Sequence, residues 1–184
     1  MDDRPYEQKI LASRADKDVA FKSAANEDSP IPQEERAGFQ GLAYYPIDAA
    51  YHVPAFLNED RSGPPLVIEL QTSTGPMRKM RKVGALKFTI GDAEYALTAF
   101  ADIDARTMDR LFVPFGDLTS GDETYKGGRY LELDRTPTGL YDLDFNRAYH
   151  PFCVFSPRFE CPIPPRENRL PVAIRAGERL VARH

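Results

Sequence analysis

The chain has 184 residues and a net charge of −4, with 42% hydrophobic and 28% charged residues. This length suits one domain with a packed core, and we expect a single domain over residues 1–184. Because Lys and Arg are scattered through an acidic chain, the composition disfavours nucleic acid or an anionic membrane as a partner. No apolar run approaches the length of a membrane span, and the first residues lack a signal-peptide pattern, so we expect a cytoplasmic protein.

Residues 6–25 are predicted to form a helix. Its apolar stripe is loose, with Ile10 and Phe21 at either side of a polar middle. Such a stripe is typical of an arm that lies on the body of a domain rather than of a core helix. We expect the helical arm to cover residues 1–32, ended by Pro30 and Pro32, with a further helical turn at residues 33–36.

From residue 41 onward, apolar residues alternate with a period of two, which predicts strands. The expected strands are 42–45, 51–57, 66–72, 85–90, 95–99, 111–115, 129–134 and 140–145, and a last strand or short helix lies within 171–180. Gly91 and Asp92 are typical of a two-residue hairpin turn. Hairpins with little helix between them predict a mainly-β body over residues 41–184, either an antiparallel sandwich or a partly open barrel with long loops.

One basic cluster, RKMRK, covers residues 78–82. We interpret it as a solvated turn or strand edge, where Lys discourages pairing with another chain. The alternative is a contact to an anion, such as the carboxylate or phosphate of a substrate.

The segment 140–169 concentrates reactive and rigid side chains. Asp142 and Asp144 lie two apart on a predicted strand, so both carboxylates point to one face. Asp142 fits a solvent-exposed face, whereas Asp144 is either structural or functional at the strand end. Asn146 and Tyr149 follow, as loop anchors or ligand contacts. His150 precedes a proline and is either a structural histidine or a proton-transfer group.

Cys153 and Cys161 flank a proline-containing loop. Buried thiols are one interpretation, and a disulfide that pins the loop is a second. A zinc site with His150 lacks a fourth ligand at useful spacing. A nucleophilic pair formed by a cysteine and His150 also stays open.

The loop 116–128 carries hydroxyl groups, including that of Thr124, that could line a polar pocket. Arg129 follows two glycines, so it could pair with Asp144 across the hairpin or clamp an anionic substrate. Asn168 follows a proline-stiffened segment that could return to the same pocket.

Four stretches carry a family resemblance: PFGDLTSGDETY at 114–125, GGRYL at 127–131, DFNRAYHPFC at 144–153 and CPIPPREN at 161–168. Together they resemble the prokaryotic domain-of-unknown-function 1684 family over most of the chain. The resemblance implies no established activity and no nucleotide or metal motif. The family usually has Asn where this chain has His150, so a mechanism that requires an imidazole there would not be shared by the family.

We therefore expect a small-molecule site walled by the loops 116–128 and 146–168. Hydrolytic or acid–base chemistry would be carried by Asp144 with Tyr149 or His150. The ligand-binding candidates are Thr124, Arg129, Asn146, Cys153 and Asn168. No metal is expected, and the cofactor, the ligand and the question of catalysis stay open. The alternative is a noncatalytic binding or interaction module in which these polar residues lock the loops.

Overall fold

The computed structural model describes residues 4–59, 66–103 and 110–181. The described helix and strands are α1 (Tyr6–Lys22), β1 (Ala43–Tyr44), β2 (His52–Glu59), β3 (Leu66–Gln71), β4 (Met77–Ile90), β5 (Ala93–Asp102), β6 (Arg110–Phe115), β7 (Arg129–Asp134), β8 (Leu140–Asp144) and β9 (Glu178–Arg179). Short 3-10 helices lie at Arg36–Gly38, Ala49–Tyr51, Phe145–Arg147, Phe152–Val154 and Arg166–Asn168.

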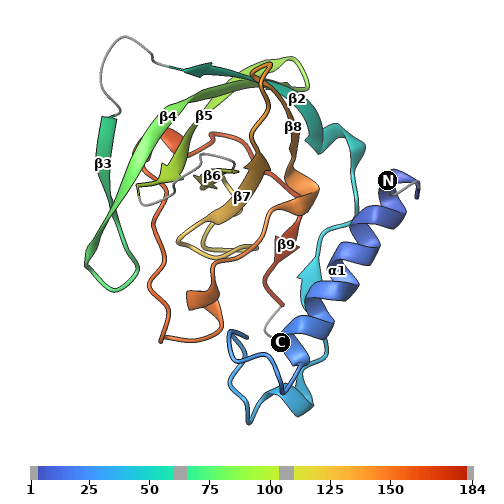
Figure 1. The fold of residues 1–184 in the computed structure, drawn as a ribbon. Coiled ribbons are helices and arrows are strands. Elements are labelled where there is room, and N and C mark those ends of the chain that lie inside the picture. Colours follow the sequence, from blue (N-terminus) through green and yellow to red (C-terminus); the bar gives the residue numbers. More distant parts are fainter. Residues whose placement is uncertain (1–3, 60–65, 104–109, 182–184) are drawn as a thin grey trace.

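The larger sheet is antiparallel and nearly closes into a barrel (Figure 1). Its strand order is β7–β6–β5–β4–β2–β8, and β3 pairs with β4 beside this path. β7 and β8, at the two ends of the order, lie close to one another. The mainly-β prediction is confirmed, and of the two predicted architectures the partly open barrel is the observed one.

The predicted hairpin at Gly91 and Asp92 is present between β4 and β5, and Gly91 adopts a φ of 60°. However, β4 begins at Met77, well before the predicted residue 85. Residues 77–82 pair with β3 on one side, and Met80, Arg81 and Lys82 also pair with β5 on the other. The basic cluster at residues 78–82 therefore lies within a strand rather than a turn, and its prediction as a turn or strand edge is wrong for residues 80–82.

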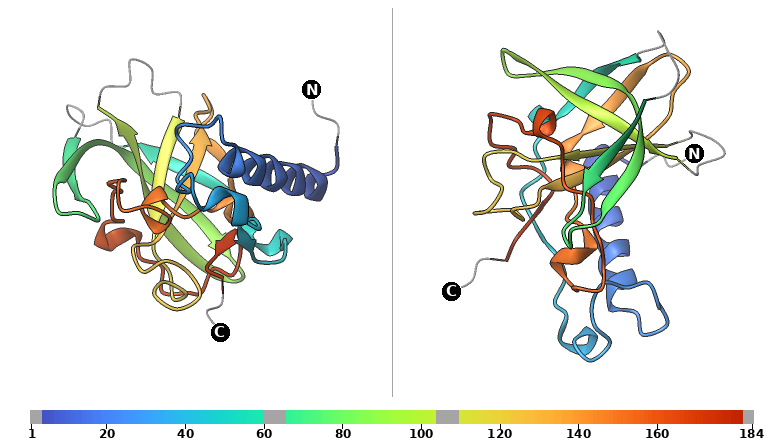
Figure 2. Two further views of the ribbon diagram at one scale, coloured as in Figure 1. Left: turned by 90° about the horizontal axis from the view of Figure 1, so that it is seen from below. Right: turned by 90° about the vertical axis from the view of Figure 1, so that its left-hand side faces the viewer.

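α1 lies along the outside of the barrel, as Figure 1 and the left view of Figure 2 show. It buries Ile10 and Phe21 and ends at Lys22, three residues before the predicted end, because the chain turns extended at Ser23. Lys17 Nζ lies 2.5 Å from Glu178 Oε1 in β9. α1 thus rests on the small β1–β9 sheet rather than in the barrel core. No helix of the described residues is long and apolar enough to cross a membrane.

Side chains fill the inside of the barrel. Six strands contribute to one buried cluster: Ala55, Leu57, Val83, Leu86, Phe88, Leu97, Ala99, Ala101, Leu111, Val113, Phe115, Leu131, Leu133, Tyr141 and Leu143. A small barrel whose interior is filled by side chains has no room for a ligand along its axis. A ligand site is therefore to be sought on the outer face of the wall.

Candidate functional site

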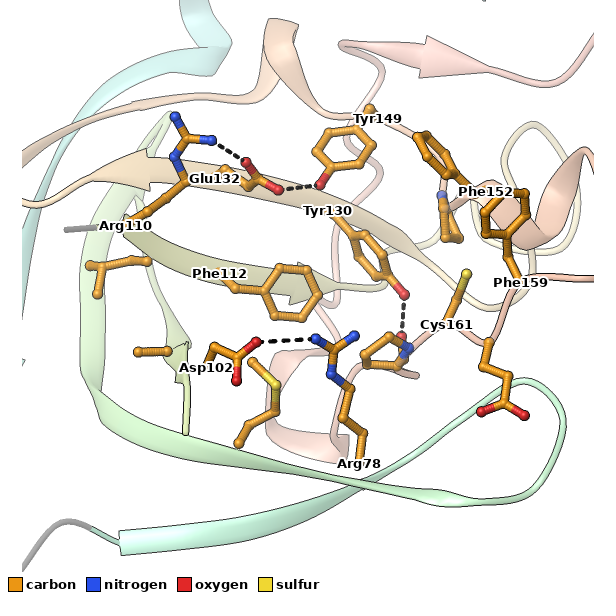
Figure 3. A pocket seen from close by; sticks show the side chains of 16 residues that line it. Arg78, Asp102, Arg110, Phe112, Tyr130, Glu132, Tyr149, Phe152, Phe159 and Cys161 are labelled. Atoms are coloured by element: carbon orange, nitrogen blue, oxygen red, sulfur yellow. Dashed lines mark hydrogen bonds and ion pairs between the residues drawn. The ribbon is translucent and has the colours of Figure 1, made fainter. Parts of the chain in front are cut away.

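A cavity of about 540 Å³ lies between the outer face of β4–β7 and the chain at residues 149–162, which we call the covering loop (Figure 3). Strand residues on its wall are Arg78, Met80, Ala101, Asp102, Arg110, Leu111, Phe112, Tyr130 and Glu132. The covering loop adds Tyr149, Pro151, Phe152, Phe159, Glu160, Cys161 and Pro162. This volume is typical of small-molecule sites.

Aromatic rings form much of the cavity wall. Phe112 on β6 and Tyr130 on β7 meet edge to face with ring centroids 4.7 Å apart. On the covering loop, Phe152 and Phe159 meet in the same way at 5.2 Å. Strand alternation explains the first pair: Leu111, Val113 and Leu131 point into the barrel core, so their neighbours Phe112 and Tyr130 point outward.

Two ion pairs border the aromatic wall. Arg110 Nη1 donates to Glu132 Oε2 at 3.0 Å, and Tyr149 Oη donates to Glu132 Oε1 at 2.8 Å. Across the cavity, Arg78 Nη2 donates to Asp102 Oδ2 at 3.4 Å (Figure 3). Among the described residues, Arg110 Nε also lies 3.4 Å from Asp134 Oδ1, whereas Arg78 is placed against Asp102 by one long contact of 3.4 Å.

Both ends of the covering loop are fastened to the sheet. At one end the Tyr149 backbone N–H donates to Tyr130 O at 3.0 Å, and the Tyr130 N–H donates back to Tyr149 O at 2.9 Å. At the other end Tyr130 Oη donates to Pro162 O, and the Ile163 N–H donates to Gln71 O at 2.7 Å. The covering loop is therefore held over the cavity at both of its ends.

The two tyrosine hydroxyls of the cavity stay neutral. Burial raises the pKa of Tyr130 well above its usual value, with nearby thiols adding to the effect. Burial also raises the pKa of Tyr149, and the Glu132 carboxylate beside it raises it further. Both phenols are hydrogen-bond donors rather than bases at neutral pH.

Asp144 and Asn146 are buried together at the end of β8, away from the cavity wall. Asp144 Oδ1 accepts hydrogen bonds from Tyr6 Oη at 2.9 Å and from the Asn146 N–H at 3.0 Å, while Oδ2 lies 3.2 Å from Arg147 Nε. Asn146 exchanges two hydrogen bonds with the backbone of Asp48. These contacts occupy both side chains in tying α1 and the chain before β2 to β8.

His150 is buried, and its ring is engaged on the protein. The Tyr125 N–H donates to Nε2 at 3.2 Å, so this nitrogen is unprotonated. Burial lowers the pKa of His150 to about 3, and the charges of Arg129 and Lys17 act in the same direction. The ring is neutral at physiological pH and is held as an acceptor.

Arg129 does not pair with Asp144, and that prediction is wrong. Its Nη2 lies 3.0 Å from Asp117 Oδ2, and its side chain is 0% exposed. The guanidinium also donates to the carbonyls of Ile174, Ala176 and Glu178. The reason is the strand order: β7 pairs with β6 and β8 pairs with β2, so β7 and β8 do not form the paired hairpin that would bring the two side chains together.

Thr124 and Asn168 are fully buried inside loops. Thr124 Oγ1 lies 2.9 Å from Thr119 Oγ1. Asn168 Oδ1 accepts from the Thr98 N–H at 2.7 Å, and Nδ2 donates to Thr98 O at 2.9 Å and to Pro114 O at 2.7 Å. Asn168 therefore links β5 to β6 at Thr98 and Pro114, beyond Phe100 and Phe112, where the two strands pair directly.

The two cysteines are free thiols in contact. The Cys153 N–H lies 3.3 Å from Cys161 Sγ, and Cys153 Sγ lies 3.9 Å from Tyr125 Oη. Cys161 is buried against the cavity, whereas Cys153 is partly exposed. Among the described residues, no group of three or more His, Cys, Asp or Glu side chains is placed to hold a metal ion.

The two loops that were predicted to form the walls of the site do lie together, but they do not enclose the aromatic cavity. The loops 116–128 and 146–168 line a different hollow of about 820 Å³, with Glu123 from the first and His150, Val154 and Phe155 from the second. Of the predicted catalytic residues, Tyr149 alone is on the wall of the aromatic cavity. Asp144, Tyr149 and Arg129 do not converge on one hollow.

Most cavity residues were not singled out from the sequence. Arg78 was considered as an anion contact within the basic cluster, and Tyr149 as a catalytic residue. Phe112, Tyr130 and Phe159 were missed. The available signal was an apolar side chain on both faces of β6 and β7, which indicates that something covers the outer face.

Comparison with known proteins agrees with the resemblance seen in the motifs. The model of the family described as "Protein of unknown function (DUF1684)" matches residues 37–179. An uncharacterized protein from Haloarcula marismortui, solved by solution NMR, is 39% identical, with a TM-score of 0.74 and coverage of 97% of this chain and 96% of that one. No curated protein matches significantly. The chain belongs to the DUF1684 family of proteins of unknown function.

Proposed function

We propose that this protein binds a small organic molecule with an apolar, flat body and one anionic group in the aromatic cavity. The observation that carries the proposal is the cavity itself, about 540 Å³ between the strand wall and the covering loop. The paired rings of Phe112 with Tyr130 and of Phe152 with Phe159 offer faces and edges to a flat ligand.

Arg78 is the group proposed to hold the anion. Its guanidinium points toward the cavity in Figure 3, and its contact with Asp102 is a half-exposed pair at 3.4 Å. Such a pair contributes little by itself, so a ligand carboxylate can replace it with a shorter, bidentate contact. Arg110 is less suited, because Glu132 and Asp134 already share its charge.

The proposal is binding rather than acid–base catalysis. Asp144 and His150 are committed to hydrogen bonds elsewhere, and Tyr149 is held neutral as a donor to Glu132. A general base must be within hydrogen-bond reach of the proton that it removes. We further expect the site to work in the cytoplasm.

Fluorescence of anilinonaphthalene sulfonate, an amphiphilic anion, tests the site. Replacing Phe112 with Ala removes part of the wall and should weaken probe binding about tenfold, in line with the loss of one buried ring. Phe56→Ala is the matched control, because Phe56 is 56% exposed on β2. Equal effects of the two substitutions would place the probe elsewhere.

Competition identifies the role of Arg78. Naphthoate and naphthylmethylammonium share a ring system and differ in charge, and we expect naphthoate to displace the probe at about tenfold lower concentration. Arg78→Gln should abolish this preference. Lys79→Gln should keep it, because Lys79 neighbours Arg78 on β4 but is not on the cavity wall. The anion proposal fails if the two competitors are equivalent on the unaltered protein.

A further inference from the structure

The covering loop carries a pair of thiols that the proposed binding function does not use. Cys161 Sγ accepts the backbone N–H of Cys153 at 3.3 Å, which places the second sulfur directly beside the first residue. Both thiols are free. A disulfide requires two sulfurs that can approach to about 2.05 Å, and neighbouring thiols on one loop meet this requirement with little motion.

The surroundings of the pair are asymmetric. Cys153 is partly exposed, whereas Cys161 is buried with 7% of its surface accessible. The hydroxyl of Tyr125 lies 3.9 Å from Cys153 Sγ. Cys161 is instead held by its backbone, which exchanges hydrogen bonds with Ser73. A small oxidant can therefore reach Cys153 first.

The electrostatics act in the same direction as the exposure. A hydrogen bond from the Cys161 thiol lowers the pKa of Cys153, and the hydroxyls of Ser73 and Tyr125 lower it further against the effect of burial. Donation to Cys153 and burial raise the pKa of Cys161. The thiolate is the reactive form of cysteine, so Cys153 is the nucleophile of the pair.

We propose that Cys153 and Cys161 form a dithiol that reacts with hydroperoxides, in which Cys153 attacks and Cys161 resolves. The Cys153 thiolate attacks one peroxide oxygen, the O–O bond breaks, and the departing hydroxide is protonated to water. Cys153 is then a sulfenic acid. The Cys161 sulfur attacks the Cys153 sulfur, the S–O bond breaks, and the oxygen leaves as water with the Cys161 proton. Two thiols and one hydrogen peroxide give one disulfide and two waters.

A disulfide between Cys153 and Cys161 would cross-link two positions within the covering loop. Phe152 directly precedes the bridged segment and Phe159 lies within it, and both line the aromatic cavity. A link from Cys153 to Cys161 closes a ring between the two places where the covering loop is fixed to the sheet. We expect backbone amides at residues 154–160 to exchange about threefold more slowly in the oxidised form. This expectation does not depend on ligand binding.

Three measurements on the full chain test the proposal. In the unaltered protein, one equivalent of hydrogen peroxide should yield a Cys153–Cys161 cross-linked peptide in mass spectrometry. Alkylation of Cys153 by iodoacetamide should show a pH midpoint well below the ordinary thiol value of about 8.5. Cys161→Ser should accumulate a sulfenic acid that dimedone captures, whereas Cys153→Ser should react with peroxide about tenfold more slowly.

The first two measurements use the unaltered protein, so their outcome does not depend on whether a cysteine variant folds. The proposal is overturned if peroxide gives sulfinic acid on Cys153 without a cross-link, or if Cys161 is alkylated faster than Cys153. An ordinary alkylation midpoint, or unchanged amide exchange in a cross-linked protein, would equally overturn it.

Discussion

Arg129 and Asp117 form an ion pair that solvent does not reach, with Nη2 3.0 Å from Oδ2 and side-chain exposures of 0% and 1%. The same guanidinium holds three carbonyls between Ile174 and Glu178. One arginine thus joins β7, the loop 116–128 and the last described segment of the chain.

Replacing Arg129 with Ala should reduce the free energy of unfolding by about 3–5 kcal/mol, because it leaves the Asp117 carboxylate buried without a cation. Urea unfolding followed by circular dichroism measures the loss. Arg175→Ala is the control, since the Arg175–Glu123 pair is exposed and should contribute at most about 1 kcal/mol. Similar losses in the two variants would contradict the assignment.

His150 should make the protein lose stability in acid. Its folded pKa of about 3 lies below the unfolded value of about 6.5, so the native state binds fewer protons between these two pH values. The stability that comes from keeping His150 neutral is fully present above a pH of about 6.5. As the pH falls toward 3, the free energy of unfolding decreases by up to about 1.4 kcal/mol per pH unit.

The measurement is the difference in unfolding free energy between the unaltered protein and His150→Gln across this range. Gln keeps an acceptor for the Tyr125 N–H but does not titrate. A difference that stays constant with pH would show that His150 is not held neutral.

Asn168→Asp should destabilise the protein by about 3 kcal/mol at neutral pH. One carboxylate oxygen would face the carbonyls of Thr98 and Pro114, where the amide now donates two hydrogen bonds. The loss in the midpoint temperature of thermal unfolding should become smaller when acid protonates the new carboxylate. Asn58→Asp is the control, because Asn58 is exposed on β2, and an equal loss there would contradict the role of Asn168.

Gly84→Ala should destabilise the barrel by about 1–3 kcal/mol through overpacking. A Cβ at Gly84 would meet the Asn58 carbonyl oxygen and the Glu59 backbone of β2, beside the bulge in β4. Gly38→Ala should be close to neutral, since a Cβ there has no neighbour within 4 Å. Urea midpoints of the two variants compare them directly, and an unchanged midpoint for Gly84→Ala would count against the close approach.

Local patterns predicted the barrel well because alternation is a local property. Leu86, Phe88, Leu97 and Ala99 alternate around a two-residue turn, and the structure buries all four in the core. The first half of β4 escaped prediction because basic residues around Met80 hide the alternation. They are tolerated there because their side chains keep access to solvent: Arg78 and Lys79 are exposed, and Arg81 and Lys82 are half-buried.

The candidate site was harder to predict because sequence chemistry does not show which side chains are already partnered. Asp144 has Tyr6 as a partner 138 positions away, and such a contact leaves no local trace. Phe112 and Tyr130, by contrast, carry no reactive group and become notable only when the covering loop is placed over them.

The docking of α1 also dictates when the molecule can finish folding. Lys17 and Glu178 are 161 positions apart, and β1 pairs with β9 over a similar separation. During synthesis on the ribosome, the barrel strands can emerge and pair before β9 is available to the helix. The helix can complete its docking only after residue 178 has emerged, so its anchoring on β9 should follow the pairing of the barrel strands.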